Sequence, residues 1–536
     1  DTYAYYCATR ALMENEGFKF KYYFDSDEEE KEYDTSYDEM YSYCQKKLYS
    51  EGYKIYTSID LTKQQQLQDS IDLTLLDFTD TTDDGTFKLQ SAATCIDNAT
   101  GYVVAIVGGR SQDATNHTLN RAFQSHRQPG SSIKPLIVYT PSFERGKTPD
   151  TIVNDHKFDG GPSNAGDSYY GDVTIRFAVE KSLNTVAWQL YDELTPKVGL
   201  QYLKDMNFTN IVKDDYVTAT ALGGFTTGVS PLEMASAYAT LENDGMYRNP
   251  TCVTSIVDSD NNIIYTSSQK DTVIYSENAA RTMTDVMTGV MTQGTGRKAK
   301  LDNGMPSAGK TGTTNDKKDG WFCGFTRYYT TCVWVGCDMP ETIKDLTGGS
   351  YPAEIWKNYM DQIHSDLTPL NFLPYAHMSD ESQDNQESQE VQDTPADDQT
   401  QNNPTDQTVT TPDEGTTTPD QTTTDPNKID AAGGNHEKTP TTPSENPSGG
   451  AGDSDSAGGT GGAGDNGSTG GAGGAGDSGS TGGAGGAGGS GSTGGTGGAG
   501  GSGSTGGTGG AGGSGSTGNT GGTTGGESGA TGGAAQ

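Results

Sequence analysis

Aromatic residues are absent from the last part of this 536-residue chain: none follows Tyr375, and large aliphatic side chains are scarce there too. A segment with so little apolar surface cannot offset the entropy that it would lose on ordering. The composition therefore predicts a disordered tail in two parts. Residues 368–448 are acidic and rich in Thr, Pro and Gln. Residues 449–536 are rich in Gly, Ser, Thr and Ala and repeat Gly-Ser-Thr at a fixed interval, which is typical of a flexible spacer.

Long apolar runs are missing as well. No stretch reaches the roughly 18 apolar residues of a membrane-spanning helix. The sequence does not open with an initiator Met or a signal peptide, so we expect it to begin within a longer protein. The formal net charge is −37 and no basic patch stands out, so nucleic acid is not expected as a partner.

The spacings of a metal site do not occur. The seven cysteines are dispersed without a CxxC pair, and the six histidines do not cluster with them. Cys95, Cys323 and Cys332 lie in apolar, strand-like runs, where cysteine behaves as a small core residue. We therefore expect no metal, and the odd number of cysteines leaves any disulfide pairing open.

Strand signals flank a mainly helical middle. Strands are predicted within 52–60, 90–110, 251–268 and 305–340. Helices are predicted within 1–53, with an acidic interruption at 25–34, and within 61–78, 130–244, 276–292 and 353–365. This order predicts an α+β domain in which an antiparallel sheet is flanked by helices.

The stretch QPGSSIKPL, residues 128–136, places a lysine three residues after a serine that follows a Pro-Gly turn. At a helix start, Ser131 and Lys134 lie one turn apart on the same face. A serine hydroxyl becomes a good nucleophile when a base takes its proton, and a lysine can be that base if burial and nearby cations lower its pKa. The alternative is an N-cap serine beside a solvated lysine. The same SxxK spacing recurs at Ser267 without supporting features.

Two further motifs carry polar groups. In EKSLNTVAW, Ser182 can relay a proton to a leaving amine and Asn184 can bind a substrate amide, although Ser-x-Asn also recurs elsewhere. The sequence KTGT at 310–313 would put a cation and hydroxyls on a strand edge, where they can hold a carboxylate. Gly312 would admit a ligand to the backbone. Taken alone, Ser-x-Asn is a weak signal, and Lys-Thr-Gly by itself is more often a strand that runs into a turn.

In this order, the SxxK, SxN and KTG motifs resemble the transpeptidase domain of bifunctional (class A) penicillin-binding proteins. The resemblance covers 52–366, with SLN at 182–184 where the family pattern has SDN. It includes LNRAFQSHRQPGSSIKP, ALGGFTTGVSPLEMASAYATLENDG, TGRKAK, GKTGTTNDKKDGWFCGFT and LTGGSYPAEIWKNYM. It implies a penicillin-binding/β-lactamase-like fold with a five-stranded antiparallel sheet over 54–367. Residues 1–53 resemble the linker after the glycosyltransferase domain. That domain and its membrane anchor are not in this sequence.

The resemblance also implies a mechanism, the cross-linking of peptidoglycan through an acyl-enzyme. Ser131 would attack the D-Ala–D-Ala carbonyl of a stem peptide, with Lys134 as base. Ser182 would pass the proton to the departing D-Ala, and Asn184 would hold the side of the substrate. Lys310, Thr311 and Thr313 would face its terminal carboxylate, beside Gly312. The oxyanion would lie between the backbone N–H groups of Ser131 and Thr313.

The implied partners are peptidoglycan stem peptides, lipid-linked glycan strands and β-lactams, which would acylate Ser131; no cofactor is expected. The expected location is the extracytoplasmic face of a bacterial membrane, with contact to the membrane only through the missing anchor. Two alternatives remain. One is a DD-carboxypeptidase or serine β-lactamase, in which water replaces the acceptor amine. The other is a non-catalytic wall-binding module on a flexible stalk.

Overall fold

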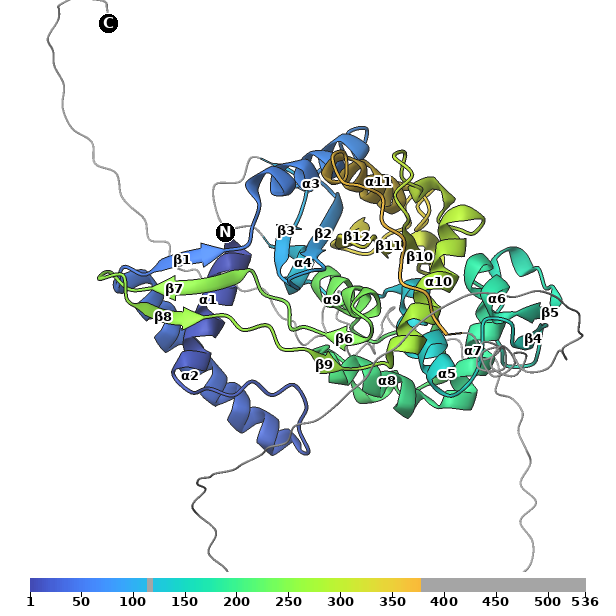
Figure 1. Ribbon diagram of the computed structural model, residues 1–536, viewed down its shortest axis with the longest axis horizontal. Coiled ribbons are helices and arrows are strands. Elements are labelled where there is room, and N and C mark those ends of the chain that lie inside the picture. Colours follow the sequence, from blue (N-terminus) through green and yellow to red (C-terminus); the bar gives the residue numbers. More distant parts are fainter. Residues whose placement is uncertain (113–118, 377–536) are drawn as a thin grey trace, which may run out of the picture. The chain divides into compact units, whose positions relative to one another are not determined.

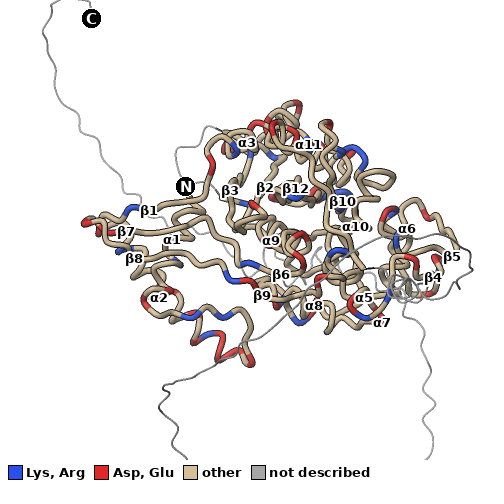
Figure 2. Tube along the Cα trace, in the orientation of Figure 1, with Lys and Arg blue, Asp and Glu red and all other residues tan. Residues whose placement is uncertain are grey.

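The computed structural model describes residues 1–112 and 119–376, and the disordered tail predicted from the composition lies outside the described residues from 377 onward. Within the described residues, none of the helices combines the length and the apolar character needed to cross a membrane. Lys and Arg are interspersed with Asp and Glu along the trace (Figure 2).

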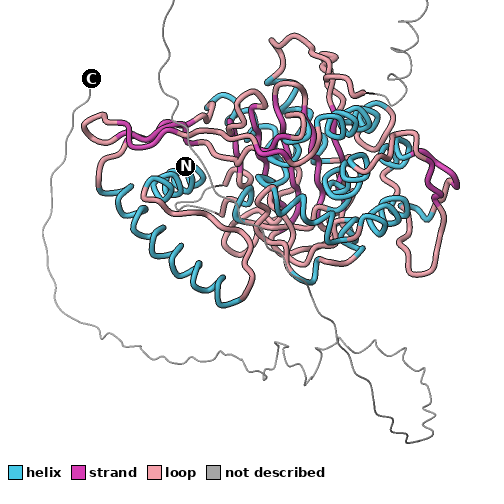
Figure 3. The backbone as a smooth tube through the Cα atoms, turned by 60° about the horizontal axis from the view of Figure 1, so that its bottom comes forward, coloured by secondary structure: helices cyan, strands magenta, loops and turns pink. Residues whose placement is uncertain are grey.

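A five-stranded antiparallel sheet lies at the core of the described residues, in the order β10-β11-β12-β2-β3 (Figure 1). Figure 3 shows strands in magenta with helices in cyan on either side. The strands of the sheet are β2 (Leu89–Asp97), β3 (Val103–Val107), β10 (Ala308–Thr313), β11 (Asp319–Phe325) and β12 (Tyr329–Cys337). The strands predicted within 90–110 and 305–340 are confirmed: the first range forms a hairpin, β2–β3, and the second forms three consecutive strands, β10 to β12. The α+β class is confirmed too, because helices cover both faces of this sheet.

The two faces of the sheet have separate apolar cores. Helices α3 (Leu61–Thr74) and α11 (Tyr351–Ile363) pack together on one face, where Leu67, Ile71 and Trp356 are buried against strand residues. Helices α9 (Pro231–Glu242) and α10 (Glu277–Thr292) cover the other face. Ser276 is the N-cap of α10, and its hydroxyl accepts a hydrogen bond from the backbone N–H of Ala279.

The remaining elements of the described residues are short helices, helical turns and two small strand pairs. The α-helices are α4 (Arg121–Gln124), α5 (Thr140–Glu144), α6 (Ile175–Lys181), α7 (Asn184–Leu194) and α8 (Pro196–Asp205). The 3₁₀ turns are η1 (Gly130–Ile133), η3 (Ala165–Asp167), η4 (Lys213–Asp215), η5 (Thr218–Leu222), η6 (Arg297–Ala299) and η7 (Asn315–Lys317), and η2 (Pro135–Tyr139) is a π-helix. Two small antiparallel pairs are β4 (Ile152–Asp155) with β5 (Gly171–Thr174), and β6 (Met246–Tyr247) with β9 (Thr272–Val273).

An N-terminal lobe is built from two distant parts of the chain. It contains α1 (Thr2–Asn15), α2 (Asp27–Ser50) and a sheet in which β7 (Val253–Val257) lies between β1 (Lys54–Thr57) and β8 (Ile263–Thr266). The predicted acidic interruption of the helix is wrong. The acidic residues form the first turn of α2, where Ser26 caps the helix and negative charge is favourable next to the helix dipole. The break between the helices falls earlier, after Asn15.

The folded chain continues past the boundary expected at residue 367. The Phe372 ring makes an edge-on contact with Phe325, with ring centroids 5.6 Å apart. The Tyr328 hydroxyl donates to the carbonyl of Thr368 (2.9 Å), and the backbone N–H of Ala376 donates to Asn278 Oδ1 (2.7 Å). Residues 368–376 thus follow the surface of the domain, although their composition resembles that of the tail.

All seven cysteines are free and buried. Cys95, Cys323 and Cys332 lie in β2, β11 and β12 with no solvent exposure, so the expectation that they are core residues is confirmed.

Candidate functional site

Ser131 lies in the first turn of η1, directly after the Pro129-Gly130 turn, and Lys134 follows it at the end of the same turn. Residues three apart eclipse one another in a 3₁₀-helix, so both side chains lie on one side of it. Gly130 adopts a φ of +53°, and a Cβ there would lie 2.7 Å from the carbonyl oxygen of Thr313. The glycine therefore lets the turn that carries Ser131 approach strand β10.

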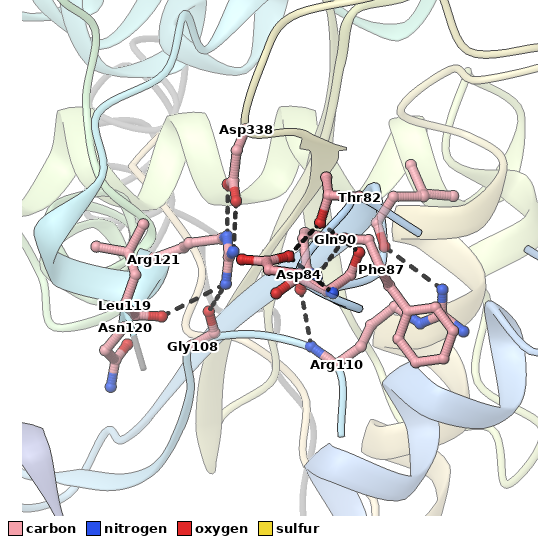
Figure 4. Close-up of polar contacts among 12 residues, drawn as sticks. Thr82, Asp84, Phe87, Gln90, Gly108, Arg110, Leu119, Asn120, Arg121 and Asp338 are labelled. Atoms are coloured by element: carbon pink, nitrogen blue, oxygen red, sulfur yellow. Dashed lines mark hydrogen bonds and ion pairs between the residues drawn. The ribbon is translucent and has the colours of Figure 1, made fainter. Parts of the chain in front are cut away.

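Several hydrogen bonds and ion pairs hold the segment that precedes Ser131. Arg121 makes a two-point ion pair with Asp338, with 2.6 Å between Nε and Oδ1, and also donates to the carbonyl of Gly108 (Figure 4). Arg127 Nε donates to Asp319 Oδ1 at 2.8 Å, and the indole N–H of Trp321 donates to the carbonyl of Gln128. The turn before Ser131 is therefore fixed to β11 and to the residue that follows β12.

Lys134 is fully buried among neutral acceptors. Its Nζ donates to the carbonyls of Ser182 and Leu183, both at 3.0 Å, and to Asn184 Oδ1 at 2.8 Å. Burial, reinforced by the neighbouring Lys310 cation, holds the pKa of Lys134 well below its usual value. Within the described residues, no carboxylate pairs with it. The hydrogen bonds of Lys134 Nζ do not include one to the Ser131 hydroxyl.

Ser182 lies between the two lysines. It ends α6 in the left-handed conformation, with a φ of +59°, and α7 begins two residues later. Its carbonyl accepts from Lys134, whereas its hydroxyl accepts from Lys310 Nζ at 2.7 Å. Burial lowers the pKa of Lys310 to about 7. The SxN and KTG motifs, 128 residues apart, thus meet at one serine.

Strand β10 presents part of its backbone to the Ser131 turn. The N–H of Thr314 bonds to the carbonyl of Asp319, so in an antiparallel ladder the preceding pair, Thr313 and Gly320, is not hydrogen-bonded. The N–H of Thr313 therefore points away from β11, at the free edge of the sheet. Thr311 has the same orientation, and its carbonyl accepts from Lys310 Nζ at 3.1 Å.

The structure shows a second constraint at Gly312, and the expectation that it admits a ligand to the backbone stays a prediction. A Cβ at this position would lie 2.2 Å from the carbonyl oxygen of Pro129 and 2.9 Å from Ser132 Oγ. The close approach is therefore made by the start of η1, and Gly312 fixes how near Ser131 comes to β10.

Three groups near the motifs were missed by sequence reasoning. The Thr295 hydroxyl lies 2.7 Å from the Thr311 hydroxyl, and the N–H of Gly348 donates to Thr313 Oγ1 at 2.9 Å. Both come from stretches that were recognised only as wholes, TGRKAK and LTGGSYPAEIW. The third is Asn164, whose Oδ1 accepts from the backbone N–H of Asn184. Asn164 lies within 130–244, where the sequence predicts mainly helices and no motif points to it.

The other occurrences of the motifs have ordinary explanations. Ser267 to Lys270 lies in the connection between β8 and β9, and Ser276 is the N-cap of α10. The expected site residues, in contrast, converge on the junction of η1, the α6–α7 connection and β10.

The sequence matches the family described as "Penicillin binding protein transpeptidase domain" over residues 91–361. The chain therefore belongs to the penicillin-binding protein transpeptidase family. The match begins in β2 and ends in α11, so it spans the central sheet and every motif discussed above.

Curated relatives carry the same family name. The chain is 36% identical over 314 residues to penicillin-binding protein 4 of Bacillus subtilis (strain 168), with 58% of this chain and 48% of the relative covered. It is 35% identical over 337 residues to penicillin-binding protein 1A of Clostridium acetobutylicum, with 59% and 41% covered. The chain thus spans about half the length of these relatives or less. The glycosyltransferase part expected upstream stays a prediction.

Solved structures share the fold. The PonA1 protein from Mycobacterium tuberculosis in complex with penicillin V has a TM-score of 0.57 and 24% identity, covering 70% of this chain and 96% of that one. Penicillin-binding protein 1A from Haemophilus influenzae has a TM-score of 0.52 and 20% identity, covering 60% and 68%. The predicted five-stranded penicillin-binding fold is confirmed.

Proposed function

We propose that this chain is a serine acyl-transferase that cross-links peptidoglycan stem peptides at D-Ala–D-Ala. The observation that carries the proposal is the single connected set formed by Lys134, Ser182 and Lys310, one turn from Ser131. Membership of the transpeptidase family supports it. The proposed location is the extracytoplasmic face of a bacterial membrane, where the substrate is found.

In the proposed acylation, the Ser131 oxygen bonds to the carbonyl carbon of the penultimate D-Ala. Its proton passes to the neutral form of Lys134, which the lowered pKa makes available near neutral pH. The C–N bond then breaks, and the departing D-Ala takes a proton through the Ser182 hydroxyl, which Lys310 orients. An amine of a second stem peptide attacks the ester, forms the new amide and returns the proton to Ser131.

Two backbone N–H groups are suited to the oxyanion of this reaction. The N–H of Ser131 lies in the first turn of η1, where helices leave such groups without an internal partner, and that of Thr313 points away from the sheet. Thr311 and Thr313, on alternate positions of β10, place two hydroxyls on one side for the substrate carboxylate. The site as proposed needs no cofactor.

The competing hypothesis is a hydrolase, in which water replaces the acceptor amine. Within the described residues, no carboxylate hydrogen-bonds to Lys134, Ser182 or Lys310. A base dedicated to activating water is therefore not found at these groups, and the transfer reaction is preferred.

Acylation by penicillin tests the proposal directly, because β-lactams mimic the substrate and the related PonA1 protein was solved with penicillin V. The purified chain should be labelled by a fluorescent penicillin, and Ser131→Ala should abolish the label. Ser267→Ala, at the second SxxK, is the matched control and should keep it. A label that persists in Ser131→Ala would falsify the assignment. A label that hydrolyses within seconds would identify a β-lactamase instead.

A further inference from the structure

Helix α7, which carries Asn184, has no capping side chain of its own. Its N-cap position is Leu183, which cannot accept a hydrogen bond from the first free N–H groups of the helix. The acceptor comes from 20 residues earlier. Asn164 Oδ1 accepts from the backbone N–H of Asn184 at 2.7 Å and from that of Thr185 at 3.3 Å. Asn164 therefore caps α7 from the connection between β4 and β5.

Asp155 in turn holds Asn164. Asp155 is 1% exposed at the end of β4, and Asn164 is 5% exposed. Asn164 Nδ2 donates to Asp155 Oδ1 at 2.6 Å, the Thr185 hydroxyl donates to the same oxygen, and the N–H of Tyr170 donates to Oδ2 at 2.9 Å. No cation lies within ion-pair distance of this carboxylate among residues 1–112 and 119–376, so its contacts serve to fix amide and hydroxyl groups.

The residue beside Asn164 fixes which way the Asn184 amide faces. Asn184 Nδ2 donates to the carbonyl of Ser163 at 2.8 Å, and a carbonyl can only accept. The amide oxygen must therefore point the other way, toward Lys134 Nζ at 2.8 Å. The contacts run without a gap from Asp155 through Asn164 and Asn184 to Lys134.

We propose that Asp155 and Asn164 are positioning residues for the Lys134 base, acting through the backbone and side chain of Asn184. The inference rests on the proposed function of Lys134. Neither residue touches Lys134 or the substrate position. They hold the start of α7 so that the amide oxygen of Asn184 keeps its hydrogen bond with Lys134 Nζ. The charged group facing that ammonium is Lys310 from β10, and the other contacts are the carbonyls from the α6–α7 junction.

Asn164→Ala leaves two buried N–H groups without their acceptor and frees Asn184 to move. We expect the second-order rate of penicillin acylation to fall about tenfold or more, because two buried donors lose their acceptor and Asn184 is no longer held against Lys134. The ammonium form of Lys134 also loses an acceptor, so the rise of the rate with pH should begin at lower pH than in the wild type. A loss of folded protein alone would reduce the rate without moving this midpoint.

Asn164→Asp gives the sharper test, because it sets a second carboxylate against Asp155. The double variant Asp155→Asn with Asn164→Asp restores one donor and one acceptor across the 2.6 Å contact. We expect the single variant to be impaired, and the double variant to recover part of the rate and of the shift in the pH midpoint, because the bond from Asn164 Nδ2 to the Ser168 carbonyl is not restored. Asn154→Ala, an exposed neighbour in β4, is the matched control and should behave like the wild type.

The outcomes are distinguishable. If the wild type is not acylated at Ser131, the proposed function fails and with it the basis of this inference. If the wild type is acylated, Asn164 variants with unchanged rate and midpoint would overturn the positioning role. So would rates that fall only in proportion to the folded fraction measured by thermal unfolding, and so would a double variant that stays as impaired as Asn164→Asp.

Discussion

Gly312→Ala should separate Ser131 from the strand that completes its site. The added Cβ would lie 2.2 Å from the carbonyl oxygen of Pro129. Carbon–oxygen contacts in proteins are about 3.3 Å or longer, so the turn must retreat by about 1 Å. A misplacement of about 1 Å can cost on the order of 10²-fold in rate. We therefore expect acylation by penicillin to slow by about a hundredfold while the sheet, whose ladder is unchanged, stays folded.

The assay is the second-order rate of acylation by a fluorescent penicillin, measured beside thermal unfolding. Gly309→Ala, on the same strand, is the matched control. Its Cβ would meet Cys323 O and Phe322 at 3.0 Å within the sheet and does not approach η1. It should affect stability more than acylation. If Gly312→Ala acylates within threefold of the wild type, the turn does not depend on this contact and the reasoning is refuted.

Two further perturbations test the electrostatics and the boundary of the domain. Lys310→Met removes the cation that helps to lower the pKa of Lys134, so that pKa should rise. Because neutral Lys134 is the reactive form, the rising limb of the rate between pH 5 and about pH 10 should move to higher pH, and an unmoved limb would count against Lys134 as base. A chain ending at Asp366 loses the Phe372–Phe325 contact and two hydrogen bonds, and should unfold about 2–3 kcal/mol more easily than one ending at Ala376. Equal melting temperatures of the two chains would show that 368–376 is not part of the fold.

Local signals explain what the sequence predicted well. The strands at 90–110 and the helices within 61–78 and 276–292 depend on neighbouring residues, and the structure contains them where they are expected. The acidic stretch in α2 was misread because charge was taken as a break, whereas its position after Ser26 makes it a favourable first turn. The sequence contained the local signal, but whether acidic residues break or begin a helix depends on where they lie relative to its N-cap.

Long-range contacts explain what was missed. The lobe sheet joins β1 to β7, which lies about 200 residues later in the chain, and no pattern within either strand encodes that pairing. Asn164 and Thr295 reach the site because the β4–β5 connection and the end of α10 happen to meet α7 and β10. The spacing of the motifs predicted that Ser131, Ser182 and Lys310 share one site only because it resembles the pattern of a known family. The hydrogen bonds that orient these side chains depend on how the elements pack.

The groups that accept hydrogen bonds from Lys134 help to set its pKa. A buried ammonium is costly, and proteins usually offset that cost with a carboxylate. A carboxylate beside Lys134 would raise its pKa and make it a structural ion pair rather than a base. The carbonyls of Ser182 and Leu183, in the connection between α6 and α7, and the Asn184 amide offer partial charges instead, which orient the nitrogen without holding the proton as firmly. Ser182 ends α6 and Leu183 precedes α7, so their carbonyls lie where one helix ends and the next begins. The left-handed turn at Ser182 creates that junction, so the backbone break between α6 and α7 determines the base as much as the lysine does.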